Sequence, residues 1–114
     1  MWKMTQEFND VIYKIHVEML GGESKEFQTV FIENMAILKS YGGLTPAEKF
    51  MAKTPRGAEM VYWAKKKVNQ EMYSTSMRKR IEQLLGAKVI HLFSDLNIAG
   101  DLTIIVFVFD ENIV

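Results

Sequence analysis

The chain has 114 residues, of which 48% are hydrophobic and 25% are charged, and these values exclude an intrinsically disordered or a fibrous protein. Lysine and arginine together number 14, as do aspartate and glutamate, so no net charge draws the whole molecule to nucleic acid or a membrane surface. Cysteine is absent, which excludes disulfides, thiolate catalysis and thiol-ligated zinc or iron–sulfur clusters. We expect a single domain over residues 1–114.

The first predicted elements are a helix and a β-hairpin. Over residues 5–20 apolar side chains recur at steps of three and four, which is typical of an amphipathic helix. Gly21-Gly22 marks the helix end, because glycine reaches the left-handed conformation without steric cost. Residues 27–33 and 35–41 are rich in β-branched and aromatic side chains, which favours two paired strands.

Two helices are predicted next, each opened by a Thr-Pro pair. Thr45 precedes Pro46, and Glu48 stands three residues after Thr45, which completes the spacing of a capping box. This predicts a short helix over 46–53. The Thr-Pro pair recurs at residues 54 and 55, and from there helical periodicity continues to residue 85.

A helix over 55–85 is too long for the domain. At 1.5 Å per residue it spans roughly 46 Å, against a diameter of roughly 35 Å for a compact chain of this size. Its apolar stripe also changes sides, from the face of Val61, Ala64, Val68 and Met72 to that of Met77, Ile81 and Leu84. Either the helix bends at residues 74–76, where three hydroxyl side chains compete for backbone partners, or its second half packs on a second copy of the chain. In the second case Met77, Ile81 and Leu84 are the candidate dimer interface.

A second hairpin, from residues 88–95 and 102–110, completes the fold. The last strand is apolar on both faces, so each face must be covered, one by helices and the other by a helix or a partner subunit. The order of elements predicts an α+β protein, helix–hairpin–helices–hairpin, with a four-stranded, largely antiparallel sheet packed against a long helix.

The residues for catalysis or metal binding are few. The two histidines, His16 and His91, lie in different elements, and His91 alternates with apolar residues, which favours a packed side chain. Four carboxylates gather near the end of the chain but lack the spacing of a calcium loop. We therefore predict no catalytic residue, no metal and no cofactor, and we favour a binding module over an enzyme.

Basic residues concentrate in the middle of the chain. Residues 45–88 carry ten basic side chains against four glutamates, a local charge of +6. With nearby aromatic residues they form a candidate surface for nucleic acid or another anion, beside a helix start whose N–H groups are free. A solvated helix face explains them equally simply, and nucleic acid is the less favoured partner. The candidate residues are Thr45, Lys65, Lys66, Lys67, Arg78, Lys79 and Arg80.

Two stretches carry a family resemblance. Residues 42–49 (Gly-Gly-Leu-Thr-Pro-Ala-Glu-Lys), and residues 84–89 (Leu-Leu-Gly-Ala-Lys-Val) leading into Phe-Ser-Asp at 93–95, resemble the bacterial DUF2294 or MpsC-like family. The resemblance covers nearly the whole chain, including the turn Glu33-Asn34. It implies an association with membrane-potential generation or inorganic-carbon uptake and a protein partner at the membrane, and it implies no catalytic residue.

The leading hypothesis is a non-enzymatic binding or accessory module that forms a homodimer. The alternatives are a nucleic-acid-binding module that uses the basic helix, and a small effector- or anion-binding domain or enzyme. No signal peptide or apolar run of about 18 residues is present, so we expect a soluble, cytoplasmic protein without membrane insertion.

Overall fold

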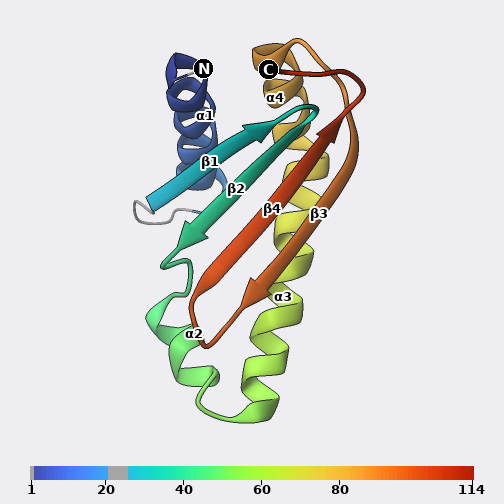
Figure 1. Ribbon diagram of the computed structural model, residues 1–114. Coiled ribbons are helices and arrows are strands. Elements are labelled where there is room, and N and C mark those ends of the chain that lie inside the picture. The colour runs from blue at the N-terminus through green and yellow to red at the C-terminus, as the bar shows by residue number, and fades with distance from the viewer. Residues whose placement is uncertain (1, 21–25) are drawn as a thin grey trace.

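The computed structural model describes residues 2–20 and 26–114 and shows the predicted order of elements (Figure 1). These are α1 (Trp2–Leu20), β1 (Glu26–Ile32), β2 (Met35–Tyr41), α2 (Pro46–Met51), α3 (Pro55–Ser74), α4 (Ser76–Leu85), β3 (Val89–Asn97) and β4 (Leu102–Phe109). The α+β class is confirmed. The glycine pair at residues 21 and 22 lies outside the described residues, as does the side chain of His16.

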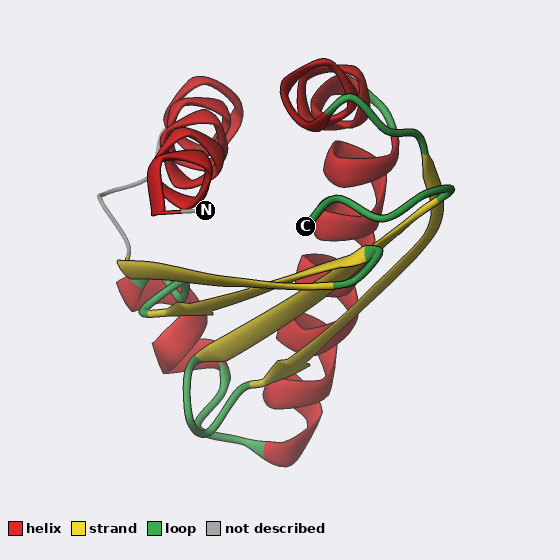
Figure 2. Cartoon of the chain, turned by 45° about the horizontal axis from the view of Figure 1, so that its top comes forward, coloured by secondary structure: helices red, strands yellow, loops and turns green. Residues whose placement is uncertain are grey.

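The four strands form one antiparallel sheet in the order β1-β2-β4-β3, so the second strand of each hairpin is central. Helices α1, α3 and α4 lie behind the sheet in Figure 1. Figure 2 shows α1 and α4 next to each other on that side, in agreement with their direct contact. The arrangement has two layers, helices and sheet.

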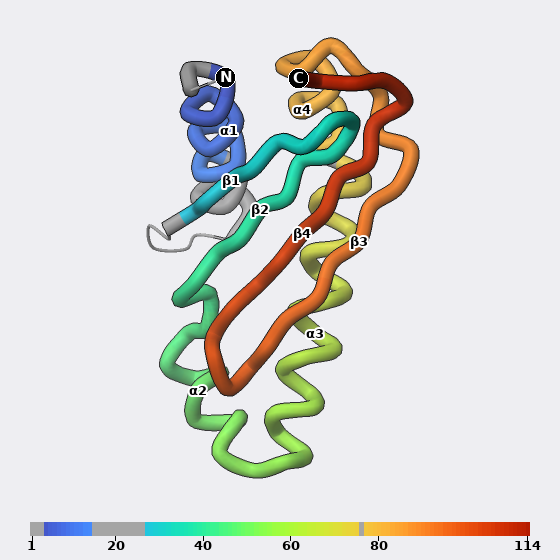
Figure 3. Tube along the Cα trace, viewed as in Figure 1, coloured from blue at the N-terminus to red at the C-terminus, as the bar shows by residue number. Residues whose placement is uncertain are grey.

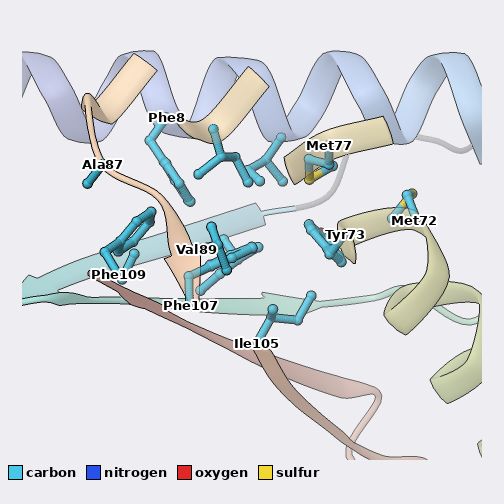
Figure 4. Close-up of a cluster of buried hydrophobic side chains, with 13 residues drawn as sticks. Phe8, Met72, Tyr73, Met77, Ala87, Val89, Ile105, Phe107 and Phe109 are labelled. Carbon is cyan, nitrogen blue, oxygen red and sulfur yellow. The ribbon is translucent and has the colours of Figure 1, made fainter. Parts of the chain in front are cut away.

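The core lies between these layers and centres on Phe107 of β4 (Figure 4). The Phe107 ring meets the Phe8 ring of α1 at 5.9 Å and the Tyr73 ring of α3 at 5.5 Å, both edge to face. Such aromatic contacts add to the free energy gained from burial. Ile105 and Phe109, two residues to either side on the same strand, are also buried, which confirms one of the two apolar faces predicted for the last strand.

The long helix bends within one chain. Thr75 separates α3 from α4 with φ −117° and ψ −90°, outside the helical region. The hydroxyls of Ser74 and Thr75 each donate to a backbone carbonyl four residues earlier, at 2.6 Å, and thus compete with the helical ladder as the sequence indicated. Gly86 then ends α4 in the left-handed conformation, with φ 71°.

This bend corrects the candidate dimer interface. Met77 and Ile81 are 0% exposed in the core of the single chain, and Leu84 packs against that core half-buried. The bend turns the apolar stripe of α4 toward α1 and the sheet, so Met77 and Ile81 offer no surface to a second copy and Leu84 offers only part of its side chain. A homodimer would have to use another face of the molecule.

The buried stripe of α3 also differs from the prediction. Val61 and Met72 are buried as expected, but Val68 is 43% exposed. The other buried residues of α3 are Asn69 and Tyr73, so the buried face is rotated about the helix axis, relative to the predicted face, toward these two residues. The rotation places a polar residue, Asn69, against the sheet.

The other side of the sheet is uncovered, and we call it the open face. Within the described residues no helix lies over it, so of the two predicted covers, a helix or a partner subunit, the first is not seen there (Figure 1). By strand alternation it carries every second residue of each strand. Phe93 and Val30 are 59% and 54% exposed on it, and His91, predicted to be packed, is exposed beside Phe93. Its main residues are Val30, Ile32, Met35, Ile37, Lys39, Tyr41, His91, Phe93, Asp95, Ile104, Val106 and Val108.

Candidate functional site

A cavity of about 520 Å³ lies where β2 ends and β4 begins, between the inner face of the sheet and α3. The segment 42–45, which links β2 to α2, forms one side of it, and the turn between β3 and β4 lies beside that segment (Figure 3). Its volume falls within the range of about 300–1,000 Å³ that is usual for small-molecule sites. The cavity is therefore the natural candidate for a functional site.

The loop at the cavity is fixed by Asp101. The backbone N–H of Gly42 donates to the Asp101 carbonyl and that of Leu44 donates to its carboxylate Oδ1, both at 3.0 Å. Asp101 itself has φ 49°, a left-handed conformation at the end of the β3–β4 turn. One aspartate thus holds two distant segments together and shapes the cavity wall.

Thr45 caps α2 as predicted. Its Oγ1 accepts from the Glu48 N–H at 3.2 Å, while Glu48 Oε1 accepts from the Thr45 N–H at 2.8 Å. The capping box is complete, and both residues line the cavity. Because α2 is short and Thr45 already serves its first turn, Thr45 has a structural role in this cap.

Lys65 closes the rim of the cavity. Its ammonium lies 3.0 Å from Glu48 Oε1 and donates to the Gly43 carbonyl at 2.7 Å. Burial alone would raise the pKa of Glu48, but the hydrogen bond from Thr45 and the pairing with Lys65 outweigh it and hold that pKa below its usual value. The charges of Lys65 and Glu48 are therefore paired with each other.

The inner wall of the cavity is a row of four residues across the sheet. In register these are Phe27, Ser40, Thr103 and Leu96, one from each strand, so two hydroxyl side chains face the cavity between two apolar ones. Asn69 of α3 lines the same space and is 6% exposed. Tyr73 also lines it, and burial raises the pKa of its phenol far above the usual value, so the phenol stays neutral.

The basic candidates are dispersed along two helices. Lys66 lies over the rings of Tyr62 and Trp63 at 5.6 and 5.7 Å, while Lys67 is exposed. Lys65 lies at the cavity, as described above, so the three consecutive lysines have different surroundings.

The second basic run lies beyond the bend. Arg78 donates to the Val89 carbonyl at 3.0 Å, and its partner Glu82 accepts from the Val89 N–H at 2.7 Å, so the pair fixes the start of β3. Lys79 lines a second cavity near Asp110, and Arg80 is exposed. That these residues bind nucleic acid stays a prediction.

The carboxylates near the end of the chain serve local roles. Asp95 Oδ1 accepts from the Tyr62 hydroxyl at 2.6 Å, and this hydrogen bond lowers the pKa of Asp95. Asp110 Oδ1 accepts from the Lys88 N–H at 3.0 Å, at the opposite end of β4 from Asp101. Among the described residues no group of three or more histidine or acidic side chains is placed to hold a metal ion.

Three cavity residues, Ser40, Asn69 and Thr103, were not predicted from the sequence. Asn69 could have been found as a polar residue on the buried, otherwise apolar face of α3, if that face had been predicted correctly. Ser40 and Thr103 become neighbours only through the pairing of β2 with β4, which links the two hairpins. Thr45 and Lys65 are the predicted site residues that the cavity does include.

The fold and the cavity define an α+β domain with a site of small-molecule size, and comparison with known proteins assigns the family. Residues 2–111 match the family described as Na+-translocating membrane potential-generating system (MpsC), and the chain belongs to this family. It is 44% identical over 113 residues, 99% of this chain and 93% of the relative, to Uncharacterized protein YrhF of Bacillus subtilis strain 168. No solved structure shows a significant match. Within the described residues no helix is long and apolar enough to cross a membrane.

Proposed function

We propose that this protein is a non-enzymatic accessory module that works as a homodimer in the cytoplasm and serves a membrane-potential-generating or inorganic-carbon transport system through a protein partner at the membrane. The observation that carries the homodimer is the open face, an apolar sheet surface without a covering element in the described residues. The description of the MpsC family supports the process.

The open face has the composition of an interface. In register, Val30, Ile37, Val106 and Phe93 form one apolar row across all four strands. Four strands about 4.8 Å apart and seven residues about 3.3 Å apart give a footprint of roughly 19 by 23 Å. An apolar surface of this extent is often functional, and we assign this one to association with a protein.

A second copy of the chain is the occupant that fits best. The next row holds Lys39 on β2 and, on the edge strand β3, Asp95, whose carboxylate also accepts from Tyr62 of α3. The two opposite charges of this row balance, so two copies can meet without net repulsion. Two sheets with the same twist also pack aligned, with interdigitated side chains in a layer about 10 Å thick. The balanced charges and the regular apolar rows support the proposal that this face meets its own copy across a two-fold axis.

Light scattering coupled to size exclusion tests the homodimer. The wild type is expected at about twice the 13.2 kDa of one chain. Phe93→Glu places a charge in the apolar row and is expected to give a monomer. Phe50→Glu is the matched control, because Phe50 is 71% exposed but lies on α2, away from the sheet, and this variant should stay dimeric.

Three outcomes contradict the proposal. A wild-type monomer at high micromolar concentration rejects the homodimer, and so does a Phe93→Glu protein that remains dimeric. A species whose ratio of absorbance at 260 and 280 nm reveals nucleic acid, released by high salt, favours the nucleic-acid module instead. The process is tested in cells that lack the chain, where a potential-sensitive dye should report a lower membrane potential, restored by the wild type and not by Phe93→Glu.

A further inference from the structure

The cavity beside α3 contains a polar group that the fold does not use. Asn69 is 6% exposed, and its side chain makes no hydrogen bond to another residue that the structure describes. An asparagine amide can donate two hydrogen bonds and accept two. Among the described residues no fully buried side-chain nitrogen or oxygen lacks a partner, so the amide atoms of Asn69 are reached from the cavity, where a ligand can bond to them.

Ser40 is a second polar residue of the cavity that the fold does not use. It is 9% exposed on the inner face of β2, and its hydroxyl has no partner among the described residues. Thr103 stands directly opposite on β4, where its hydroxyl joins the same wall. Three polar side chains from three elements, β2, α3 and β4, therefore line one cavity. Local helix or strand formation does not explain why polar residues stand at these three positions.

The residues that line the cavity indicate whether its ligand is charged. Phe27, Leu38 and Ile105 supply apolar surface around the polar groups. Lys65 and Glu48 are paired with each other at the rim, and the Asp101 carboxylate holds the Leu44 N–H. Lys49, the other charged residue of the lining, is exposed to solvent. The buried polar residues of the lining, Ser40 and Asn69, thus offer hydrogen bonds but no charge, and a charged group would lose its hydration beside them without compensation.

We infer that this cavity binds an uncharged, mainly apolar small molecule whose carbonyl, amide or hydroxyl group forms hydrogen bonds with Asn69 and Ser40. Its apolar part packs between the sheet and α3. The site is separate from the open face, since Ser40 and Thr103 project from the opposite side of the sheet.

Fluorescent probes of matching chemistry test this site. Prodan is an uncharged naphthalene with a carbonyl acceptor, and N-phenylnaphthylamine is an uncharged relative with an N–H donor; both emit at shorter wavelength in an apolar site. The wild type is expected to bind both and to bind the anionic anilinonaphthalene sulfonate more weakly. The titration is repeated with Phe93→Glu, so that any binding to the open face is removed.

Two variants of α3 distinguish the site from general hydrophobic binding. Asn69→Leu keeps the size of the side chain and removes its hydrogen bonds, so affinity for the probes should fall about tenfold. Gln70→Leu makes the same chemical change at the next position, which is exposed and outside the cavity, and affinity should be unchanged. Circular dichroism verifies that both variants fold.

The proposal is overturned if neither uncharged probe binds, if Asn69→Leu binds as tightly as the wild type, or if binding disappears in Phe93→Glu. Nuclear magnetic resonance gives a second, independent measurement. Prodan should shift the side-chain amide signal of Asn69 and leave that of Gln70 in place. An unmoved Asn69 signal at saturating probe also rejects the site.

Discussion

Lys65 and Glu48 join α3 to the first turn of α2, with the ammonium 3.0 Å from carboxylate Oε1. The same carboxylate oxygen accepts from the Thr45 N–H and so completes the helix cap. One glutamate therefore stabilises a helix start, a contact between helices and the rim of the cavity.

Glu48→Gln should lower the free energy of unfolding by about 0.5–1 kcal/mol at pH 7, because glutamine can still cap the helix but cannot pair with Lys65. The folded-state pKa of Glu48 lies below its ordinary value of 4.5, so its contribution is present above that pH and lost as the pH falls through the folded value. Urea unfolding should show the wild type and the variant converging as the pH falls below 4.5 and through the lowered pKa of Glu48.

Glu59→Gln is the control for that measurement, because Glu59 is exposed on the same helix α3 and forms no ion pair with a described residue. Its unfolding curve should match the wild type at every pH. A Glu48→Gln difference that persists at pH 3 would contradict the role of the charge.

Asn69→Leu should stabilise the protein without ligand. At 6% exposure the Asn69 amide has lost most of its contact with water and has no hydrogen bond to a described residue in exchange, whereas leucine fills nearly the same volume and has no polar group to satisfy. Thermal unfolding should show a higher midpoint than the wild type. A lower midpoint would mean that Asn69 serves the fold, and the reason for assigning it to a ligand would be lost.

Gly57→Ala should be strongly destabilising. A Cβ at residue 57 would lie 1.8 Å from the Met51 carbonyl oxygen and 2.8 Å from its carbon, so α2 and α3 would have to separate. We expect a loss of about 2–3 kcal/mol or more in the free energy of unfolding.

Gly43→Ala provides the comparison for Gly57→Ala, since a Cβ at residue 43 meets nothing within 4 Å. Its free energy of unfolding should change by less than about 0.5 kcal/mol in chemical denaturation. Equal effects at the two glycines would contradict the close approach of α3 to the end of α2.

Phe107 and Phe93 lie on opposite faces of neighbouring strands and should respond differently to alanine. Phe107 is 0% exposed, so Phe107→Ala should cost about 3–5 kcal/mol at any protein concentration. Phe93→Ala should lower the unfolding midpoint only at concentrations where the wild type is dimeric, because its contacts would come from the second copy. Unfolding measured across a dilution series checks both, and a concentration-independent effect at Phe93 would speak against the dimer.

Much of the fold could be predicted because its signals are local. The two Thr-Pro pairs, the capping box and Gly86 set helix ends through contacts within a few residues, and each cap is present. The two hairpins follow from short connections between β-rich segments. The competing hydroxyls at residues 74 and 75 also act locally, so the position of the bend could be predicted. That the bend buries the apolar residues of α4 in the same chain could not.

Which residues of α3 and α4 are buried and which are exposed depended on tertiary structure. The bend at Thr75 redirects α4, and its apolar residues enter the core of the same chain instead of facing a partner. In α3 the structure buries Asn69 and exposes its neighbour Val68. Residue spacing does not distinguish two adjacent positions when apolar residues lie on both sides of the buried face.

The sequence by itself determined the elements, the α+β class and the family. Tertiary structure decided that the hairpins meet through β2 and β4, which brings Ser40 opposite Thr103 across 63 residues of chain and leaves one apolar face open. Local preferences act over a few neighbouring residues, whereas pairing between hairpins depends on the burial of the whole sheet. The cavity and the open face therefore exist only in the folded arrangement, and both candidate functions depend on them.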